Sequence, residues 1–231
     1  MSTDFHNHSL FGIDDGPSSF EESIEMLNTL HAQNVDNVVL TPHFFVHQSV
    51  ASFLRHRNES FSKIKNSVPR SLKIHLGAEV SLEDKITNEV DLKLLTIANT
   101  NKILIRLPFF SFEDWIDEEL HNLLYKHKLF PIFSSIDRYA ITYPQDKYEK
   151  LLSTPGAAFQ FNSRSLTSPD VIKTIATLTT QNKTVLFGTN AHNMATRKPD
   201  FSDIFENLSN GLDPIHSSYL LMQNNKFLKG C

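Results

Sequence analysis

The stretch DFHNHSLFGIDDGPSSFEESIEMLNTLHAQNVDNVVLTPH, residues 4–43, predicts a strand, a helix and a second strand in succession. Asp4–His6 and Val35–Thr41 have the length and composition of buried strands. Between them, Ser18 and Glu21 have the spacing of a capping box, and the apolar residues that follow recur on one helical face. The stretch therefore predicts one β-α-β unit.

The same order recurs along the rest of the chain. Further strands are predicted at Leu72–Val80, Ile103–Leu107, Pro131–Ser134, Ala157–Asn162 and Thr184–Thr189. Further helices are predicted at Ala51–Asn66, Glu113–His127, Tyr148–Ser153, Pro169–Asn182 and Phe201–Leu208. Apolar strands that alternate with helices are typical of a parallel sheet. Seven strands favour an incomplete α/β barrel over an open sheet, in a single domain over residues 1–231.

Composition excludes several classes of protein. The net charge of -4 and the absence of a long Lys/Arg run argue against a nucleic-acid partner. No apolar run approaches the roughly 20 residues of a membrane helix. Cys231 is the single cysteine, which we expect in a frayed tail, and the segment MSTDFHNH lacks the features of a secretory signal. We expect a cytoplasmic protein without membrane insertion.

Residues suited to metal binding occur at or just beyond the predicted strand ends, where functional side chains of parallel α/β folds gather. His6 and His8 are two residues apart on an extended segment, so both imidazoles point to one face. With 11 histidines in the chain, this pair alone can arise by chance. The set as a whole predicts a shared site, and its mixed nitrogen and oxygen donors favour Mn, Fe or Zn over Ca. Its members are His6, His8, Asp15, His43, Glu79 and His192.

Several motifs together resemble those of the PHP (polymerase and histidinol phosphatase) family. They are DFHNH at 4–8, GIDDGP at 12–17, EES at 21–23, LTPH at 40–43, GAE at 77–79, DRY at 137–139, QFN at 160–162 and AHN at 191–193. Their order and spacing match the bacterial tyrosine-protein phosphatases of capsule and exopolysaccharide synthesis. The resemblance implies a distorted seven-stranded (β/α)7 TIM-like barrel. It also implies two or three metal ions, usually Mn, that hydrolyse phosphotyrosine through an activated water. The implied partner is a phosphotyrosine protein such as a polysaccharide-synthesis tyrosine kinase.

By position, the six residues named above correspond to retained metal ligands of that family, whereas three other ligand positions differ. Arg106 replaces a glutamate, Ser135 a histidine and Asn190 an aspartate, which makes the site three charge units more positive. Fewer carboxylates offset less of the repulsion between divalent ions. We therefore expect one or two ions rather than three, and a site without metal remains an alternative.

Two outcomes follow for function. In the first, the protein is a phosphoesterase of reduced activity. In the second, it is a pseudophosphatase that binds a phosphorylated or anionic partner through Arg106, Arg138 and Arg197, of which the last two correspond to phosphate-binding arginines of the family. A structural subunit of a polysaccharide-synthesis complex is a third hypothesis. The arginines also have purely structural alternatives, in which Arg106 pairs with Glu79 or Asp15, Arg138 pairs with Asp137 or with the carbonyls of the next helix, and Arg197 is a solvated loop residue. Phe44, Phe45, Phe109, Phe110 and Phe112 either line a cleft or pack in the core. The sequence does not determine the oligomeric state.

Overall fold

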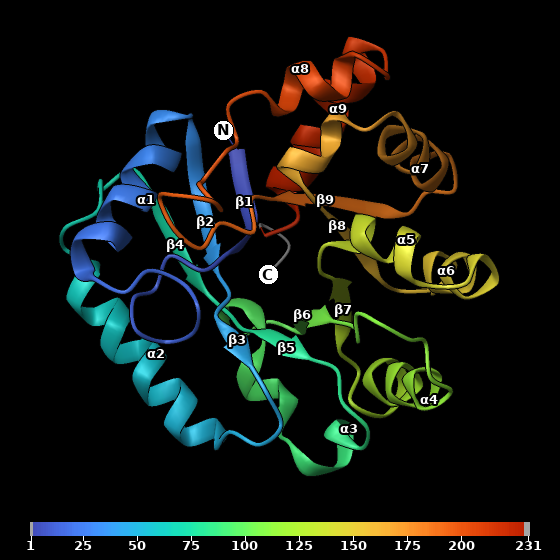
Figure 1. Ribbon diagram of the computed structural model, residues 1–231, viewed down its shortest axis with the longest axis horizontal. Coiled ribbons are helices and arrows are strands. Elements are labelled where there is room, and N and C mark those ends of the chain that lie inside the picture. Colours follow the sequence, from blue (N-terminus) through green and yellow to red (C-terminus); the bar gives the residue numbers. More distant parts are fainter. Residues whose placement is uncertain (1, 229–231) are drawn as a thin grey trace.

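The computed structural model of the chain describes residues 2–228, so Cys231 lies outside the described residues. Strands occupy the middle of the molecule and helices surround them (Figure 1). This is the expected α/β arrangement with parallel sheets.

Parallel strands form two sheets in the described part of the chain. One has the order β1-β2-β4 and the other has the order β3-β5-β6-β7-β8-β9. The strands are β1 Ser2–Asn7, β2 Val35–Leu40, β3 His43–Phe44, β4 Lys73–Leu76, β5 Glu79–Ser81, β6 Lys102–Arg106, β7 Phe130–Phe133, β8 Ala158–Asn162 and β9 Thr184–Gly188. The helices are α1 Phe20–Ala32, α2 Val50–Ile64, α3 Ile86–Glu89, α4 Trp115–His121, α5 Tyr139–Thr142, α6 Gln145–Leu152, α7 Pro169–Thr180, α8 Ile204–Ser209 and α9 Pro214–Lys226.

Breaks separate two pairs of short strands. The second predicted strand, Val35–Thr41, corresponds to β2 alone, and β3 follows as a separate strand, because Pro42 between them has no N–H for the ladder. The third gives β4 and then β5, with Gly77 at the break. Backbone hydrogen bonds nevertheless continue across both breaks: Gly77 N–H donates to Leu40 O at 2.9 Å, and Glu79 N–H donates to Pro42 O at 3.0 Å. His43 and Glu79 therefore begin strands instead of following them, and they face each other in the β3–β5 pairing.

The first and last strands meet along a seam. Asn7, the last residue of β1, forms a parallel bridge with Ala191, which lies just beyond the end of β9. The Asp4 carboxylate, fully buried, accepts hydrogen bonds from Thr189 N–H at 2.9 Å and from Thr189 Oγ1 at 2.6 Å. A side chain of β1 thus supplies hydrogen bonds that a continuous backbone ladder would otherwise make.

Helix α9, which the sequence analysis missed, completes the seam. Its start is marked by Asp213, whose carboxylate accepts from His216 N–H, and by Pro214 at the first helical position. Its polar residues are distributed around the helix, so no apolar stripe marks it in the sequence. Buried Asn224 accepts from Phe187 N–H of β9 at 2.9 Å and donates to Thr3 O of β1 at 2.7 Å.

The N-cap of helix α1 lies one residue later than predicted. The N-cap is Ser19, whose hydroxyl accepts from Glu22 N–H, whereas Ser18 and Glu21 were predicted for these roles. The Glu22 carboxylate accepts from Ser18 N–H at 3.3 Å and from Met194 N–H at 3.1 Å. Glu22 therefore ties the start of α1 to the segment that follows His192.

An apolar layer lies directly below the polar groups that the strands carry toward their carboxyl ends. The layer consists of Phe5, Val39, Ile97, Leu104, Ile132, Ala158 and Leu186. Because side chains alternate along a strand, residues two positions further on share the same face. In β6, at the end of β7 and in β8 these residues are polar, namely Arg106, Ser134 and Gln160. No helix in residues 2–228 is long and apolar enough to span a membrane.

Replacing Asn224 by alanine is expected to lower the free energy of unfolding by about 3 kcal/mol, because it leaves the buried Phe187 N–H and Thr3 C=O without partners. Urea unfolding followed by circular dichroism measures the change. Ser218→Ala, at an exposed position of the same helix, is the control and should differ from wild type by less than about 0.5 kcal/mol. Equal stability of both variants would contradict the role given to Asn224.

Candidate metal centre

Three buried side chains from β1, its following loop and β5 bring their donor atoms together. His6 Nε2 lies 3.0 Å from His8 Nε2 and 3.2 Å from Glu79 Oε1. His8 Nε2 lies 3.8 Å from Glu79 Oε2. All three residues are at most 3% exposed, so water does not separate the groups. Two imidazole nitrogens and a carboxylate therefore face one point inside the molecule.

The hydrogen bonds of His6 determine which of its nitrogens carries the proton. Gln160 Nε2 donates to Phe161 O at 2.8 Å, and Gln160 Oε1 accepts from Ser135 N–H at 2.7 Å, which fixes the orientation of the amide. His6 Nδ1 lies 2.9 Å from the same Oε1 and must therefore donate to it. When His6 is neutral, its Nε2 atom therefore presents a lone pair toward His8 and Glu79.

Asp14 fixes His8 in the same way. Its Oδ2 atom lies 2.7 Å from His8 Nδ1 and accepts from His43 N–H at 2.9 Å, while its Oδ1 atom accepts from Gly16 N–H. His8 Nδ1 is therefore the donor, and its Nε2 atom also presents a lone pair. A histidine whose second nitrogen is held by a carboxylate or an amide oxygen is the usual arrangement of metal-binding histidines.

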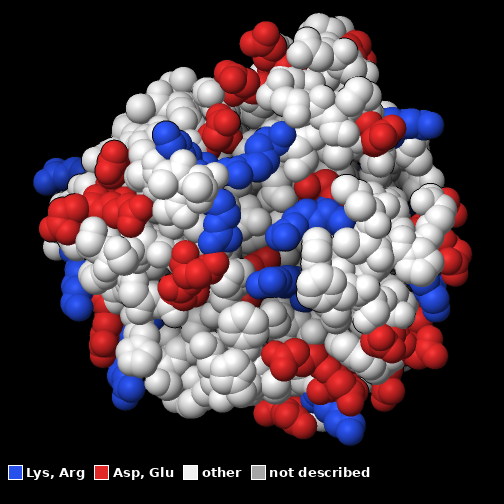
Figure 2. All heavy atoms as spheres, viewed as in Figure 1, with Lys and Arg blue, Asp and Glu red and all other residues white. Residues whose placement is uncertain are grey.

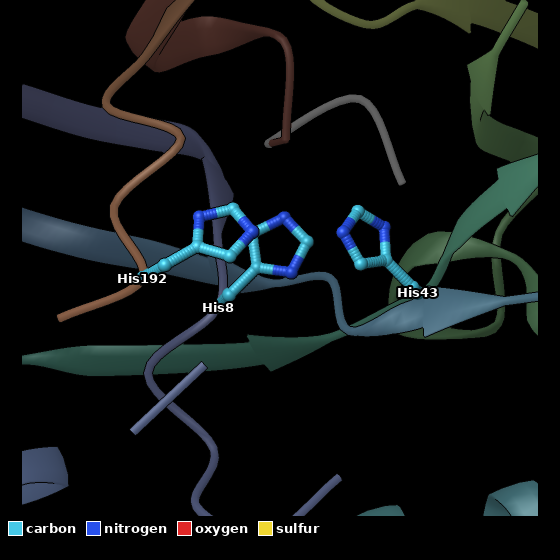
Figure 3. Close-up of side chains that lie close together, drawn as sticks. All are labelled: His8, His43 and His192. Carbon is cyan, nitrogen blue, oxygen red and sulfur yellow. The ribbon is translucent and has the colours of Figure 1, made fainter. Parts of the chain in front are cut away.

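A second set of donors adjoins the first. Figure 3 shows His8, His43 and His192 with their rings close together, and the ring centroids lie 3.8 Å apart for His8–His192 and 4.4 Å for His8–His43. Asp15 Oδ1 lies 3.2 Å from His43 Nε2 and 3.4 Å from His192 Nε2. His43 Nδ1 lies 2.7 Å from Glu79 Oε2, although without hydrogen-bond alignment. Glu79 therefore touches both donor sets.

The donor atoms fit a divalent cation. His192 Nδ1 donates to Asn190 O at 2.9 Å, which leaves its buried Nε2 lone pair without a hydrogen bond. Asn190 Oδ1 is likewise buried without a donor. Three groups each have donor atoms within 4.8 Å of one another, namely His6–His8–Glu79, His8–His43–His192 and Asp14–Asp15–His43. Histidine nitrogens and carboxylate oxygens of this kind could hold Mn, Fe or Zn.

The protonation states also suit metal binding. Burial, together with nearby His8, lowers the pKa of His192 to about 3, and burial lowers the pKa of His8 despite its bond to Asp14. Both imidazoles are therefore neutral at pH 7. Burial acts to raise the pKa of Glu79, but the adjacent His6 and His43 outweigh it and hold that pKa well below its usual range.

Neutral groups occupy the side of the site where the sequence departs from the family pattern. Ser135 and Asn190 both have left-handed backbone angles, with φ of 48° and 51°. Ser135 Oγ donates to Asn162 Oδ1 at 3.1 Å and accepts from Asn190 Nδ2 at 3.3 Å. These side chains satisfy each other and add no charge, so the charged donors are confined to the opposite side.

A cavity of about 130 Å³ adjoins the donor groups, and cationic side chains gather around a central hollow of this face (Figure 2). Arg106, Arg138 and Arg197 line the cavity together with Asp15 and Glu79, which leaves one positive charge in excess before any cation is counted. Its other lining residues are His43, Phe109, Ser134, Ser135, Tyr139, Asn190 and His192.

The three arginines differ in their partners. Arg197 pairs with Asp15 at 2.5 Å, and the Arg138 guanidinium stacks over the Phe109 ring at 4.9 Å. Within residues 2–228, Arg106 has no carboxylate within 4.0 Å. The alternatives in which Arg106 pairs with Glu79 or Asp15 are therefore wrong. Arg197 is 37% exposed and paired with Asp15, so it is partly solvated. Asp137 accepts from the Asn162 backbone and from Ser165 Oγ instead of pairing with Arg138.

All six predicted ligands converge, and two supporting residues were missed. Asp14 was passed over for its neighbour Asp15, because sequence alone does not show which of two adjacent carboxylates points inward. Gln160 falls within the quoted QFN motif, yet amides rarely signal a metal site. His47, four residues after His43, is exposed and stacks on Phe45 outside the cluster.

Comparisons with known proteins identify a matching family and several relatives. The family model described as capsular polysaccharide synthesis, CpsB/CapC, matches residues 2–228. The tyrosine-protein phosphatase CpsB of Streptococcus agalactiae is 22% identical over 238 residues, spanning 96% of this chain and 95% of that protein. The CapC protein of Staphylococcus aureus is 30% identical over 109 residues, a match that spans only 46% of this chain and 42% of that protein.

Solved structures show the same fold. One comes from work on YwqE of Bacillus subtilis and CpsB of Streptococcus pneumoniae, described as metal-dependent tyrosine phosphatases. It has a TM-score of 0.73 at 22% identity, covering 96% of this chain and 94% of that chain. An amidohydrolase from Mycoplasma synoviae has a TM-score of 0.57 at 12% identity, covering 97% and 86%.

Removing the Asp14 charge is expected to change how stability depends on pH. Burial acts to raise the pKa of Asp14, but its hydrogen bond with His8 outweighs this and lowers the pKa from 3.8 to about 2. A carboxylate whose pKa is lower in the folded state stabilises the fold at pH values above its unfolded-state pKa. This stabilisation is lost as the pH falls through its folded-state pKa. In metal-free protein, wild type should exceed Asp14→Asn by about 2 kcal/mol at pH 5–7, and the difference should shrink below pH 3.8.

Urea unfolding of both proteins in chelator, repeated from pH 7 to pH 3, measures this difference. A stability difference that stays constant over the whole range would contradict the hydrogen bond between ionised Asp14 and His8.

Proposed function

The chain belongs to the CpsB/CapC family of capsular polysaccharide synthesis, and on that basis we propose that it is a metal-dependent phosphoesterase acting on phosphotyrosine in proteins. The observation that carries the proposal is the convergence of His6 Nε2, His8 Nε2 and Glu79 beside a cavity lined by arginines. Metal-binding groups and anion-binding groups that share one cavity are what hydrolysis of a phosphate ester requires.

The proposal includes the architecture of the chain. Counting each interrupted pair as one, β1, β2/β3, β4/β5, β6, β7, β8 and β9 would form the distorted seven-stranded (β/α)7 barrel of PHP type. The hydrogen bonds across the two breaks and the bridge between Asn7 and Ala191 support this interpretation. The barrel would constitute a single domain over residues 1–231.

The ligands of the metal would come from both donor sets. His6, His8 and Glu79 would hold one ion, and Asp15, His43 and His192, with Glu79 shared, would hold a second. We propose Mn and one or two ions, because the neutral groups of Ser135 and Asn190 offset no further positive charge. Bound metal supplies a Lewis acid that polarises the phosphate and lowers the pKa of bound water.

The arginines would bind the phosphoryl group. Guanidinium groups bind phosphate oxygens in pairs, and Arg106 is half-buried with no carboxylate partner in the described residues, so its charge is available to an anion. Arg138 and Arg197 lie on the same cavity, each held by a neighbour. The arrangement favours substrate binding, while the replaced ligands predict slow turnover.

The proposed partner is a phosphotyrosine protein such as a polysaccharide-synthesis tyrosine kinase, met in the cytoplasm. Support comes from the capsule-synthesis family and from relatives named tyrosine-protein phosphatases.

Protein purified without chelator is expected to contain one or two equivalents of Mn and to hydrolyse an aryl phosphate. His6→Ala and Glu79→Gln should each lower metal affinity by more than about 100-fold, because each removes a direct ligand. Elemental analysis and titration calorimetry measure the metal, and release of the aryl alcohol measures hydrolysis. The control is His47→Ala, an exposed histidine outside the cluster. Absence of both metal and turnover in wild type would refute the proposed function.

A pseudophosphatase is the second candidate, favoured by Arg106 and by the neutral chain of Ser135, Asn162 and Asn190. In this case the protein would bind phosphotyrosine without hydrolysing it. Persistent binding in protein that lacks turnover would select this candidate over the first.

Both candidates predict that the arginines bind the phosphate. Replacing Arg138 and Arg197 together by alanine should weaken binding of a phosphotyrosine peptide by about 100-fold, since charge-assisted bonds contribute roughly 1.5–3 kcal/mol each. Calorimetry measures the change, with the exposed Arg70→Ala as the matched control. Unchanged binding by the double variant would exclude the cavity as the anion site.

A further inference from the structure

The cavity is too small for a whole substrate. Its volume of about 130 Å³ is well below the roughly 300 Å³ at which pockets begin to enclose drug-sized ligands. Arginine, serine, asparagine and histidine side chains line most of it, as suits a phosphoryl group. The organic part of a phosphate ester would therefore lie outside, against residues at the mouth.

Phe109 lines the cavity beside a phosphate-binding candidate. It belongs to the segment 107–114, which connects β6 to α4 without helix or strand. Its ring carries the Arg138 guanidinium 4.9 Å from its centroid. A cation and an apolar aromatic surface are thus adjacent, with the cation inside the anion-binding cavity.

Phe110 has no packing role that accounts for it. Its side chain is 88% exposed, and its ring meets Phe109 edge to face with centroids 5.2 Å apart. Other phenylalanines that follow strand ends have such roles: Phe44 is fully buried in the core, and Phe112 packs on Tyr143 at 5.4 Å. Phe110 therefore extends the aromatic surface of Phe109 into solvent next to the cavity.

We propose that Phe109 and Phe110 make this site selective for aromatic over aliphatic phosphate esters, by stacking on the ring that carries the phosphate. This inference rests on the proposed function of the same cavity. A tyrosyl ring places flat apolar surface directly outside the phosphoryl group, where the two phenylalanine rings can contact it. A phosphoserine has one methylene in that position and would bring polar peptide backbone against the rings.

Calorimetry with non-hydrolysable ligands tests this selectivity. The probes are methylphosphonate and two peptides of identical sequence that carry a phosphonate analogue of either phosphotyrosine or phosphoserine, all with Mn present. Wild type is expected to bind the aromatic peptide about 10-fold more tightly than the aliphatic one. Phe110→Ala, and Phe109→Leu combined with Phe110→Ala, should progressively remove this preference, measured relative to methylphosphonate. Phe109→Leu retains apolar volume, so the loop keeps its packing.

Ile215→Ala is the matched control, since Ile215 is 84% exposed on α9 and does not line the cavity. Its preference should equal that of wild type. Equal binding of both peptides by wild type, or an unchanged preference in the double variant, would overturn the selectivity while leaving phosphate binding by the arginines in place. Failure of all three probes to bind would overturn both this inference and the proposed function.

Discussion

The arrangement of the site depends on two imidazoles that are held by their outer nitrogens. Gln160 and Asp14 accept the Nδ1 protons of His6 and His8, so the two Nε2 lone pairs face each other at 3.0 Å with Glu79 alongside. Two lone pairs at this distance repel unless a proton or a cation lies between them. A proton on His6 Nε2 would be directed at Glu79 Oε1, 3.2 Å away, whereas a metal cation would bind both imidazoles and the carboxylate. A buried metal cation would thus turn this repulsion into attraction.

The fold brings these groups together through the two interruptions of its strands. Pro42 separates β2 from β3 and Gly77 separates β4 from β5, and after these breaks His43 and Glu79 start paired strands of the second sheet. The seam between β1 and β9 positions His6 and the segment that carries His192, and Asp4 and Asn224 stabilise it with side-chain hydrogen bonds. Polar side chains in the seam therefore hold the two ends of the chain in register at the site.

Much of this was predictable from sequence, for identifiable reasons. Strand and helix order follows from apolar periodicity, and the six ligand candidates follow from residue type and position after strands. Strand β3 was not predicted, because His43–Phe44 is too short to show a strand pattern, and the break at Gly77 was not predicted, because Leu72–Val80 reads as one strand. Asp14, Gln160 and α9 were missed because their roles depend on contacts with residues far away in the chain. Asn224, for example, contacts Thr3 across 221 positions.

The site has two halves of different chemistry. One half has buried histidines and carboxylates, and the other has arginines beside the neutral Ser135 and Asn190. The most direct test of the central claim is anomalous diffraction from crystals grown with Mn. Bound Mn should give an anomalous peak within about 2.3 Å of His6 Nε2, His8 Nε2 and a Glu79 oxygen, the length of metal–nitrogen and metal–oxygen bonds. Density without such a peak at saturating Mn, with both imidazoles still 3.0 Å apart, would contradict the claim.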